Sequence, residues 1–285
     1  MLDDAAVFPP GLAPLPDAVA AHRAHEAAWY GGLVGPLVIA ASALGALAEV
    51  VRAGGDPAAG PVTGAAPLRL ALTFPGGPAT VAEALEASAA LPVSVEALEI
   101  AVPDGMEPGE LPAALDAAVP ATATAEVFVE IPRDARRDPL LAALAGTRYR
   151  AKFRTGGVRA ELYPDEAELA AAVRAAVGAG VAFKATAGLH HAVRATDPDT
   201  GFEQHGFLNL LLATEAAAAG AGEAALRDLL SERDGAVVAR RIRELGPERV
   251  AAARARFTSF GTCSVTDPLT ELAGLGLLTE PPGAA

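Results

Sequence analysis

Short apolar runs alternate along the chain with amphipathic, alanine-rich stretches, and Gly/Pro turns separate the two. The apolar runs are rich in β-branched and aromatic residues, which favour strands, whereas the Ala/Leu/Glu-rich stretches favour helices. This alternation predicts parallel strands joined by crossover helices. We predict strands at residues 4–8, 37–42, 68–74, 97–102, 126–131, 149–154, 181–186 and 256–260. Helices are predicted at residues 18–29, 44–52, 81–90, 110–118, 139–145 and 166–177, with a longer helical insertion at about residues 200–254.

Eight strand–helix units in 285 residues predict a closed (β/α)8 barrel, the TIM barrel, as one domain over residues 1–285. The insertion would follow the seventh strand. An open, doubly wound sheet is the main rival, but no Gly-x-Gly-x-x-Gly motif follows the first strand. Residues 54–67 are rich in Gly, Pro and Ala, and we expect them to form a loop rather than a domain linker.

The chain is acidic, with a formal net charge of −13 and a pI of about 4.8. Nucleic acids and anionic membrane surfaces require clustered cations, so we expect neither as a partner. The single cysteine, Cys263, excludes an internal disulfide framework and fits a reducing compartment. No basic segment precedes an apolar one near the N-terminus, and the apolar run at residues 33–48 is short and interrupted by Pro36. We therefore expect a cytoplasmic protein that acts on a small molecule.

Only two lysines, Lys152 and Lys184, stand against twenty arginines. Arginine stays protonated, whereas a lysine that is buried or crowded by cations loses its proton and becomes a nucleophile. Alternation along the strands predicts that both lysines point into the barrel from neighbouring strands. Each lysine has a glycine four residues further on, so the two segments have similar settings.

The same alternation predicts further charged side chains inside the barrel. Glu99, Glu130 and Arg150 face inward by parity, and so do Arg69, Glu126 and Arg154. Buried charges are costly unless they are paired, and a purely structural barrel would fill these positions with Val, Ile and Leu. Concentrated interior charge therefore indicates an active site.

A lysine amine attacks a carbonyl group only in its neutral form, so its pKa must fall from about 10.4 towards neutrality. We predict that Lys152 forms a Schiff base and that Lys184 is the neighbouring cation that lowers its pKa. Glu99, Asp4 and Glu130 are the predicted interior acids, with Glu99 and Asp4 moving protons. This chemistry makes and breaks carbon–carbon bonds with no metal and no organic cofactor.

Seven segments, in order along the chain, resemble the deoxyribose-phosphate aldolase family of class I aldolases. They are the acidic residues before Pro9 and Pro10, LALTFPGG at 70–77, ALEIAVP at 97–103, VFVEI at 127–131, KFRTG at 152–156, FKATAGL at 183–189 and RFTSFGTCS at 256–264. The resemblance implies a barrel-shaped lyase in which Lys152 forms the Schiff base and Lys184 is the second lysine. It also implies that Glu99 stands at the position of the catalytic aspartate.

The chain departs from this family where a phosphate would bind. Gly188-Leu189-His190-His191 stands where the family has paired glycines and an arginine, and the last turn has one serine, Ser264, in place of two. We therefore expect a small aldehyde or ketone, sugar-derived or not, and leave open whether a phosphate is recognised. The residues predicted to line or support the substrate site are Glu130, Arg150, Arg154, Thr155, Gly156, Gly157, Thr186, Gly188, His190, His191, His205, Asn209, Gly261, Thr262 and Ser264.

Two alternatives remain open from the sequence. His190, His191 and His205 are suitable metal ligands near a barrel mouth, which would indicate a metal-dependent barrel hydrolase. A catalytically silent barrel whose insertion binds a partner is the other alternative, and a homodimer is left open. Cys263 is expected to be a buried thiol rather than a nucleophile.

Overall fold

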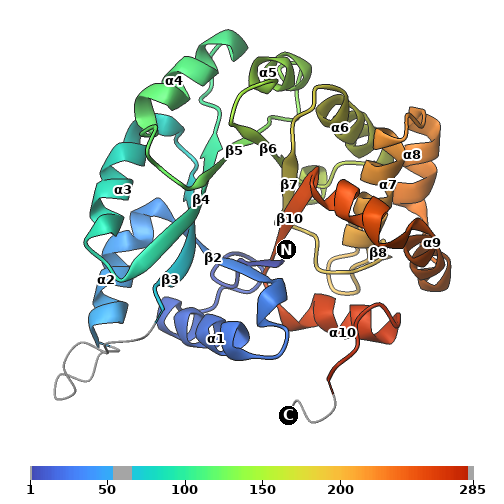
Figure 1. Cartoon of the computed structure of the whole chain (residues 1–285), viewed down its shortest axis with the longest axis horizontal. Coiled ribbons are helices and arrows are strands. Elements are labelled where there is room, and N and C mark those ends of the chain that lie inside the picture. The colour runs from blue at the N-terminus through green and yellow to red at the C-terminus, as the bar shows by residue number, and fades with distance from the viewer. Residues whose placement is uncertain (1, 54–65, 282–285) are drawn as a thin grey trace.

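The protein is a closed barrel of eight parallel strands surrounded by helices, as a computed structural model shows (Figure 1). The structure describes residues 2–53 and 66–281, so most of the predicted loop at 54–67 lies outside the described residues. The strands follow one another around the barrel in the order β1-β10-β7-β6-β5-β4-β3-β2. The predicted (β/α)8 fold is confirmed.

The eight barrel strands lie close to the predicted ranges, apart from the first. They are β1 (Leu2–Asp4), β2 (Val34–Ala40), β3 (Leu68–Phe74), β4 (Val93–Ala101), β5 (Glu126–Glu130), β6 (Arg150–Arg154), β7 (Phe183–Thr186) and β10 (Phe257–Thr262). The prediction of a first strand at 4–8 was wrong. Val7 and Phe8 read as a strand by residue type, but the chain leaves the sheet after Asp4, and Phe8 packs inside the barrel.

Ten α-helices are assigned among residues 2–53 and 66–281. They are α1 (Leu15–Ala27), α2 (Leu44–Ala53), α3 (Val81–Ala89), α4 (Leu111–Ala118), α5 (Arg137–Leu144), α6 (Glu166–Gly178), α7 (Phe207–Ala218), α8 (Glu223–Ser231), α9 (Gly235–Arg254) and α10 (Thr266–Gly274). No helix was predicted at α10. Within α9 the chain kinks at Gly246, which has φ of 71° and precedes Pro247, a residue that cannot donate a helical hydrogen bond.

Alternation along the strands divides the buried residues into two layers. Residues such as Leu72, Ile100 and Phe153 point outward and pack against the helices. The inner layer is smaller and consists of Val38, Ala71, Ala97 and Phe128, with Ala5 and Phe8 against it. Because several of these inner residues are small, the barrel interior has room for polar side chains and a cavity.

The insertion after β7 belongs to the outer layer of the barrel. A short hairpin, β8 (Ala195–Thr196) with β9 (Glu203–Gln204), precedes α7, which contacts α6 and β10. The Phe207 ring stacks on Phe260 of β10 with centroids 4.6 Å apart. Helix α7 therefore completes the helical ring beside β7 and β10, and α8 and α9 pack around it (Figure 1).

Asn209 joins α7 to neighbouring segments of the insertion through side-chain hydrogen bonds. It is fully buried on α7; its side-chain oxygen accepts from the Arg194 backbone N–H at 2.9 Å, and its amide donates to the Leu229 and Glu232 carbonyls, each at 2.8 Å. We expect Asn209→Ala to lower the free energy of unfolding by about 3 kcal/mol, because buried backbone groups lose their partners. Urea denaturation measures this.

Thr214→Val on the same helix is the matched control for Asn209. The buried Thr214 hydroxyl bonds only the Leu210 carbonyl of its own helix, so its loss should cost about 1 kcal/mol or less. Equal losses of unfolding free energy in the two variants would contradict the proposed contribution of the Asn209 hydrogen bonds.

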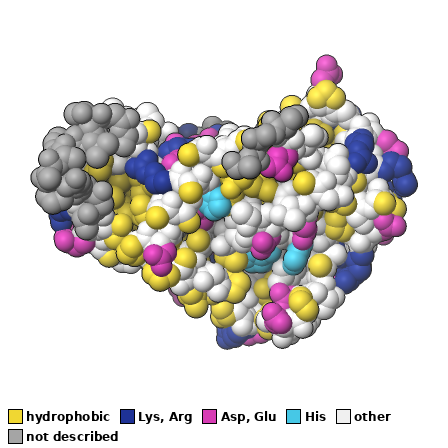
Figure 2. Space-filling model, turned by 90° about the horizontal axis from the view of Figure 1, so that it is seen from below, with side chains coloured by type: hydrophobic (Ala, Val, Ile, Leu, Met, Phe, Trp, Pro, Cys, Tyr) yellow, Lys and Arg dark blue, Asp and Glu magenta, His cyan; other side chains and the backbone are white. Residues whose placement is uncertain are grey.

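One face of the molecule shows apolar, acidic and basic side chains interspersed, with no continuous basic patch (Figure 2). That surface does not offer the clustered cations that nucleic-acid binding needs. Within residues 2–53 and 66–281, no helix has both the length and the apolar character needed to span a membrane.

Candidate functional site

The strand register brings the two lysines together. Lys152 of β6 and Lys184 of β7 are direct register partners, as predicted, and both are buried. On the other side of β6, Glu130 of β5 is the register partner of Lys152. The predicted inward parity is confirmed for these residues and for Glu99 of β4, which is also buried.

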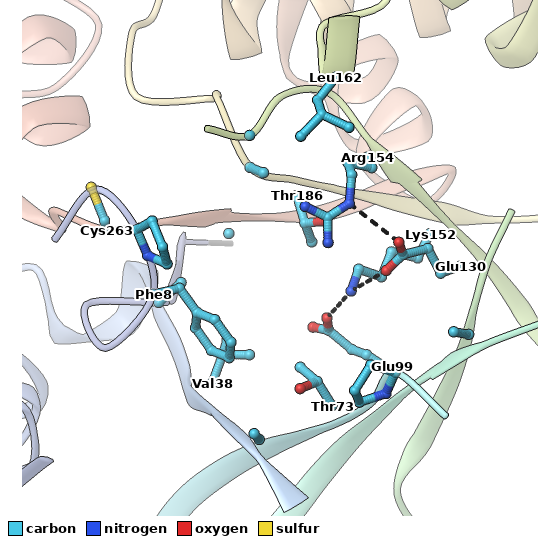
Figure 3. A pocket seen from close by; sticks show the side chains of 18 of the residues that line it. Phe8, Val38, Thr73, Glu99, Glu130, Lys152, Arg154, Leu162, Thr186 and Cys263 are labelled. Carbon is cyan, nitrogen blue, oxygen red and sulfur yellow. Dashed lines mark hydrogen bonds and ion pairs between the residues drawn. The ribbon is translucent and has the colours of Figure 1, made fainter. Parts of the chain in front are cut away.

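Six side chains form a continuous line of alternating charge across the barrel interior, and we call this line the ion-pair chain. Figure 3 shows four of its members, Glu99, Lys152, Glu130 and Arg154. It runs Asp3–Lys184–Glu99–Lys152–Glu130–Arg154, with successive nitrogen–oxygen distances of 2.5, 2.5, 2.7, 2.9 and 3.2 Å. The Ser259 hydroxyl also donates to Asp3 at 2.7 Å, and Lys184 Nζ lies 5.1 Å from the centre of the Phe128 ring. Every charge in the chain therefore has an oppositely charged partner.

The pairing determines the protonation of the deepest groups. Burial alone would raise the pKa of Glu99, but Lys152 and Lys184 outweigh it and lower that pKa to about 2. Burial alone would lower the pKa of Lys184, but Asp3 and Glu99 outweigh it and raise that pKa above its ordinary value. Glu99 is thus a carboxylate and Lys184 an ammonium at neutral pH. In the same way, Lys152 and Arg154 outweigh burial and lower the pKa of Glu130.

Glu99 lies between the two amines and bonds both of them. The sequence predicts that the two lysines act on one another directly as neighbouring cations. Instead, the nearest charged partners of each lysine are carboxylates, because unpaired ammonium groups at these buried positions would be too costly. The prediction of Lys184 as the nearest charged neighbour of Lys152 was therefore wrong, because Glu99 is bonded to both amines.

A cavity of about 390 Å³ opens at the carboxyl-terminal ends of the strands. Its lining includes the last residues of six strands: Ala40, Phe74, Ala101, Glu130, Arg154 and Thr186. Lys152 and Glu99 also line it (Figure 3), whereas Lys184 is not among the lining residues. Binding sites of (β/α)8 barrels lie at this face, so the cavity is the candidate site, and Lys152 is the lysine that faces it.

Six of the fifteen residues predicted to line or support the site contact this cavity: Glu130, Arg154, Gly157, Thr186, His190 and Gly261. Arg150 forms an ion pair, as predicted, with Glu126 at 2.5 Å, and it lies over the Phe128 ring. Its predicted place at the substrate site was wrong, because both residues lie at the amino-terminal ends of β5 and β6. Inward parity gave the correct face for Arg150 but not its depth along the barrel.

Five other predicted residues do not line the cavity, because they hold the turns around it. The Thr155 hydroxyl donates to the Ala187 carbonyl at 2.6 Å. Gly156 and Gly188 pack against one another beside the Tyr163 ring. The Thr262 hydroxyl donates to the Ser264 carbonyl at 2.9 Å, and the Ser264 hydroxyl accepts from the Asp267 backbone N–H at 3.3 Å.

The three histidines do not converge on one point. His191 bonds Glu271 at 2.6 Å, and the buried His205 lies between the Pro164 carbonyl at 2.8 Å and Arg194 at 3.1 Å. Burial lowers the pKa of His205 to about 4, so its ring is neutral. The described parts of the chain hold no group of three or more His, Cys, Asp or Glu side chains placed to bind a metal ion. The three histidines therefore do not form the set of metal ligands that the hydrolase alternative requires. Asn209 bonds backbone groups of neighbouring segments and does not reach the cavity.

His190 is the histidine that reaches the cavity, where its Nδ1 lies 3.4 Å from Cys263 Sγ. Burial lowers the pKa of His190 and raises the pKa of the Cys263 thiol. Both groups are therefore neutral at pH 7, which supports the prediction that Cys263 is not a nucleophile.

The acid of the first strand is Asp3, not Asp4. Asp4 points outward, where its carboxylate bonds His22 of α1 at 3.0 Å and accepts from the Ala6 backbone N–H at 3.1 Å. The prediction of Asp4 in the lysine cluster was wrong because it rested on a strand placed at 4–8. With β1 at Leu2–Asp4, Leu2 faces the helices and Asp3 faces Lys184.

Comparison of the chain with family models, with curated proteins and with solved structures gives no match. The resemblance to deoxyribose-phosphate aldolases therefore rests on the seven segments alone.

Proposed function

We propose that the protein is a class I aldolase-like lyase in which Lys152 forms a Schiff base with a small aldehyde or ketone. The observation that carries this proposal is the position of Lys152, whose amine faces an otherwise largely apolar cavity with carboxylates on two sides. A lysine on a barrel wall within reach of a bound carbonyl group is the arrangement that imine formation requires.

In the proposed reaction, Lys152 first loses a proton to solvent through the open mouth of the cavity, on the side of Glu130. Glu130 is the more accessible of its two carboxylate partners, with 26% of its side chain exposed against 1% for Glu99. The neutral amine then adds to the carbonyl carbon, and the carbinolamine loses water to give an iminium cation. Glu99, which stays ionised, stabilises that cation through charge.

The iminium then draws electrons from the neighbouring carbon–carbon bond. The bond between the α- and β-carbons breaks to give an enamine on Lys152 and a free aldehyde, and the hydroxyl proton of the departing fragment passes to solvent at the cavity mouth. Protonation of the enamine carbon and hydrolysis of the imine return the free amine and release the second carbonyl compound. Lys184 remains protonated throughout and holds Glu99 in place between the two lysines.

Borohydride trapping tests this proposal. The chain has three amines, namely Lys152, Lys184 and the N-terminus, and Lys184 is sealed from the cavity. We expect borohydride with a small aldehyde or ketone to add one reduced adduct per folded chain, seen as a mass increase of the intact protein. A catalytically silent barrel would give no more adduct than the same chain gives in denaturant, and that result would rule out imine chemistry.

A further inference from the structure

We infer that the substrate of this cavity is an uncharged β-hydroxycarbonyl compound with an apolar tail and no phosphate group. This inference rests on the proposed function, since it takes Lys152 as the group that holds the carbonyl carbon. The apolar cavity wall, the balanced charge of the ion-pair chain and the crowded turns beside Tyr163 favour the same substrate class.

Apolar side chains make up most of the cavity wall. Phe8 and Pro9 come from the loop after β1, and Val38 lies within β2 (Figure 3). On another wall, Val158 and Leu162 come from the segment between β6 and α6. Val158 is 67% exposed, so an apolar side chain stands at the surface where a ligand would enter. Such a wall gains free energy from burying hydrocarbon and offers nothing to a hydrated anion.

Each cation of the ion-pair chain is already paired with a carboxylate. Within the ion-pair chain, the carboxylates of Asp3, Glu99 and Glu130 balance Lys152, Lys184 and Arg154 one for one. Lys152 and Lys184 are held by buried carboxylates, so within the ion-pair chain a phosphate could reach only the half-exposed Arg154, where Glu130 already offsets the charge. One shared guanidinium is a weak site for a phosphate, because a bound anion needs its own paired cations.

Two of the glycine turns near the cavity are crowded by the Tyr163 ring. A Cβ atom built on Gly156 would lie 2.7 Å from the Tyr163 ring, and one built on Gly188 would lie 2.8 Å from it. The Tyr163 hydroxyl donates to the Gly157 carbonyl at 3.0 Å, which holds the ring there. At the first turn of α10, Ser264 already accepts from the Asp267 N–H, and the Asp267 carboxylate occupies the positive end of that helix.

One polar group in the cavity has no partner. The Thr186 hydroxyl is buried and makes no hydrogen bond to any described residue, although Thr186 lines the cavity beside Arg154. A buried hydroxyl without a partner is costly, and a ligand oxygen would satisfy it. Aldol cleavage requires a substrate with a hydroxyl group β to the carbonyl, and Thr186 is the group that would bind that hydroxyl.

The test compares the half-saturating concentrations for borohydride trapping at pH 7. The panel is a series of 4-hydroxy-2-alkanones of increasing chain length and matched compounds that end in a phosphate. We expect the half-saturating concentration to fall by about tenfold or more from the shortest ketone to a six- or eight-carbon ketone. For a phosphorylated compound, we expect a half-saturating concentration at least about tenfold higher than for the matched ketone without phosphate. Equal or tighter binding of the phosphorylated compounds would overturn the inference while leaving the imine proposal intact.

A binding arm separates the two proposals. The Lys152→Arg variant cannot form an imine, and calorimetry on this variant compares 1-hexanol with inorganic phosphate. We expect hexanol to bind and phosphate not to bind. If no ketone is trapped by the wild type but hexanol still binds the variant, the imine proposal fails while the apolar cavity stands. If phosphate binds and hexanol does not, the inference fails.

Two substitutions test which residues discriminate against a phosphate and which recognise the substrate hydroxyl. Val158→Lys would add a free cation at the exposed mouth and should improve trapping of a phosphorylated ketone by about tenfold, whereas Val158→Ala should not. Thr186→Val keeps the shape but removes the hydroxyl, so the preference for a 4-hydroxy ketone over the ketone without that hydroxyl should fall by about tenfold. An unchanged preference in Thr186→Val would overturn the assignment of Thr186.

Discussion

Lys152→Arg is expected to lose about 10³-fold or more of both trapped adduct and carbon–carbon bond cleavage. Guanidinium stays protonated at neutral pH and does not attack a carbonyl group, so the substitution removes the nucleophile. It keeps a positive charge between Glu99 and Glu130, which both bond Lys152 in the wild type. The variant should therefore remain folded, as thermal unfolding would show.

Arg154→Lys supplies the control for Lys152. Arg154 lies one inward position further along β6, and its partner in the ion-pair chain is Glu130. The double variant Lys152→Arg with Arg154→Lys has the same amines and guanidinium groups, but with their positions exchanged. We expect no recovery of trapping, because the new amine lies away from Glu99. Full recovery would mean that any amine near the cavity suffices and would contradict the special position of Lys152.

Glu99→Gln is expected to lower the free energy of unfolding at pH 7 by about 3–5 kcal/mol. Glu99 is the only carboxylate in the ion-pair chain that bonds both lysines, with distances of 2.7 and 2.5 Å. A neutral amide would leave two buried ammonium groups with one carboxylate partner fewer. Glu96→Gln on the same strand is the control: Glu96 pairs with Arg69 at a half-exposed position, so its loss should cost about 1 kcal/mol or less.

The effect of Glu99→Gln should depend on pH. The pKa of Glu99 is about 2 in the folded protein against 4.5 ordinarily, so its contribution is fully present above pH 4.5 and is lost as the pH falls towards 2. The difference in pKa corresponds to stabilisation on the order of 3 kcal/mol. Urea denaturation at pH 7, 4.5 and 3 should show the gap between wild type and variant narrowing. A gap that is independent of pH would contradict the ionised state of Glu99.

The sequence predicted the barrel and the inward face of most strands because a two-residue period is local information. Once β6 and β7 are neighbours, alternation alone brings Lys152 and Lys184 to the interior, and the register makes them partners. Alternation does not give depth along the barrel axis, which is why Arg150 was expected at the cavity but lies with Glu126 at the other end.

The errors in the site have equally specific causes. A strand of three residues carries no readable alternation, so residue type placed β1 too far along the chain and selected Asp4 in place of Asp3. The partners of His191 and His205 come from Glu271, Pro164 and Arg194, and such contacts between separate segments leave no local pattern. Tyr163 covers Gly156 and Gly188 for the same reason.

The most direct measurement is peptide mapping of the borohydride-reduced adduct after proteolysis of the wild-type protein. Because the chain offers only two lysines and one N-terminal amine, every location of the added mass is distinguishable. We predict the mass on the peptide that contains Lys152, with Lys184 and the N-terminus unmodified. Adduct on Lys184, or adduct confined to the N-terminus, would contradict Lys152 as the reactive amine of the cavity.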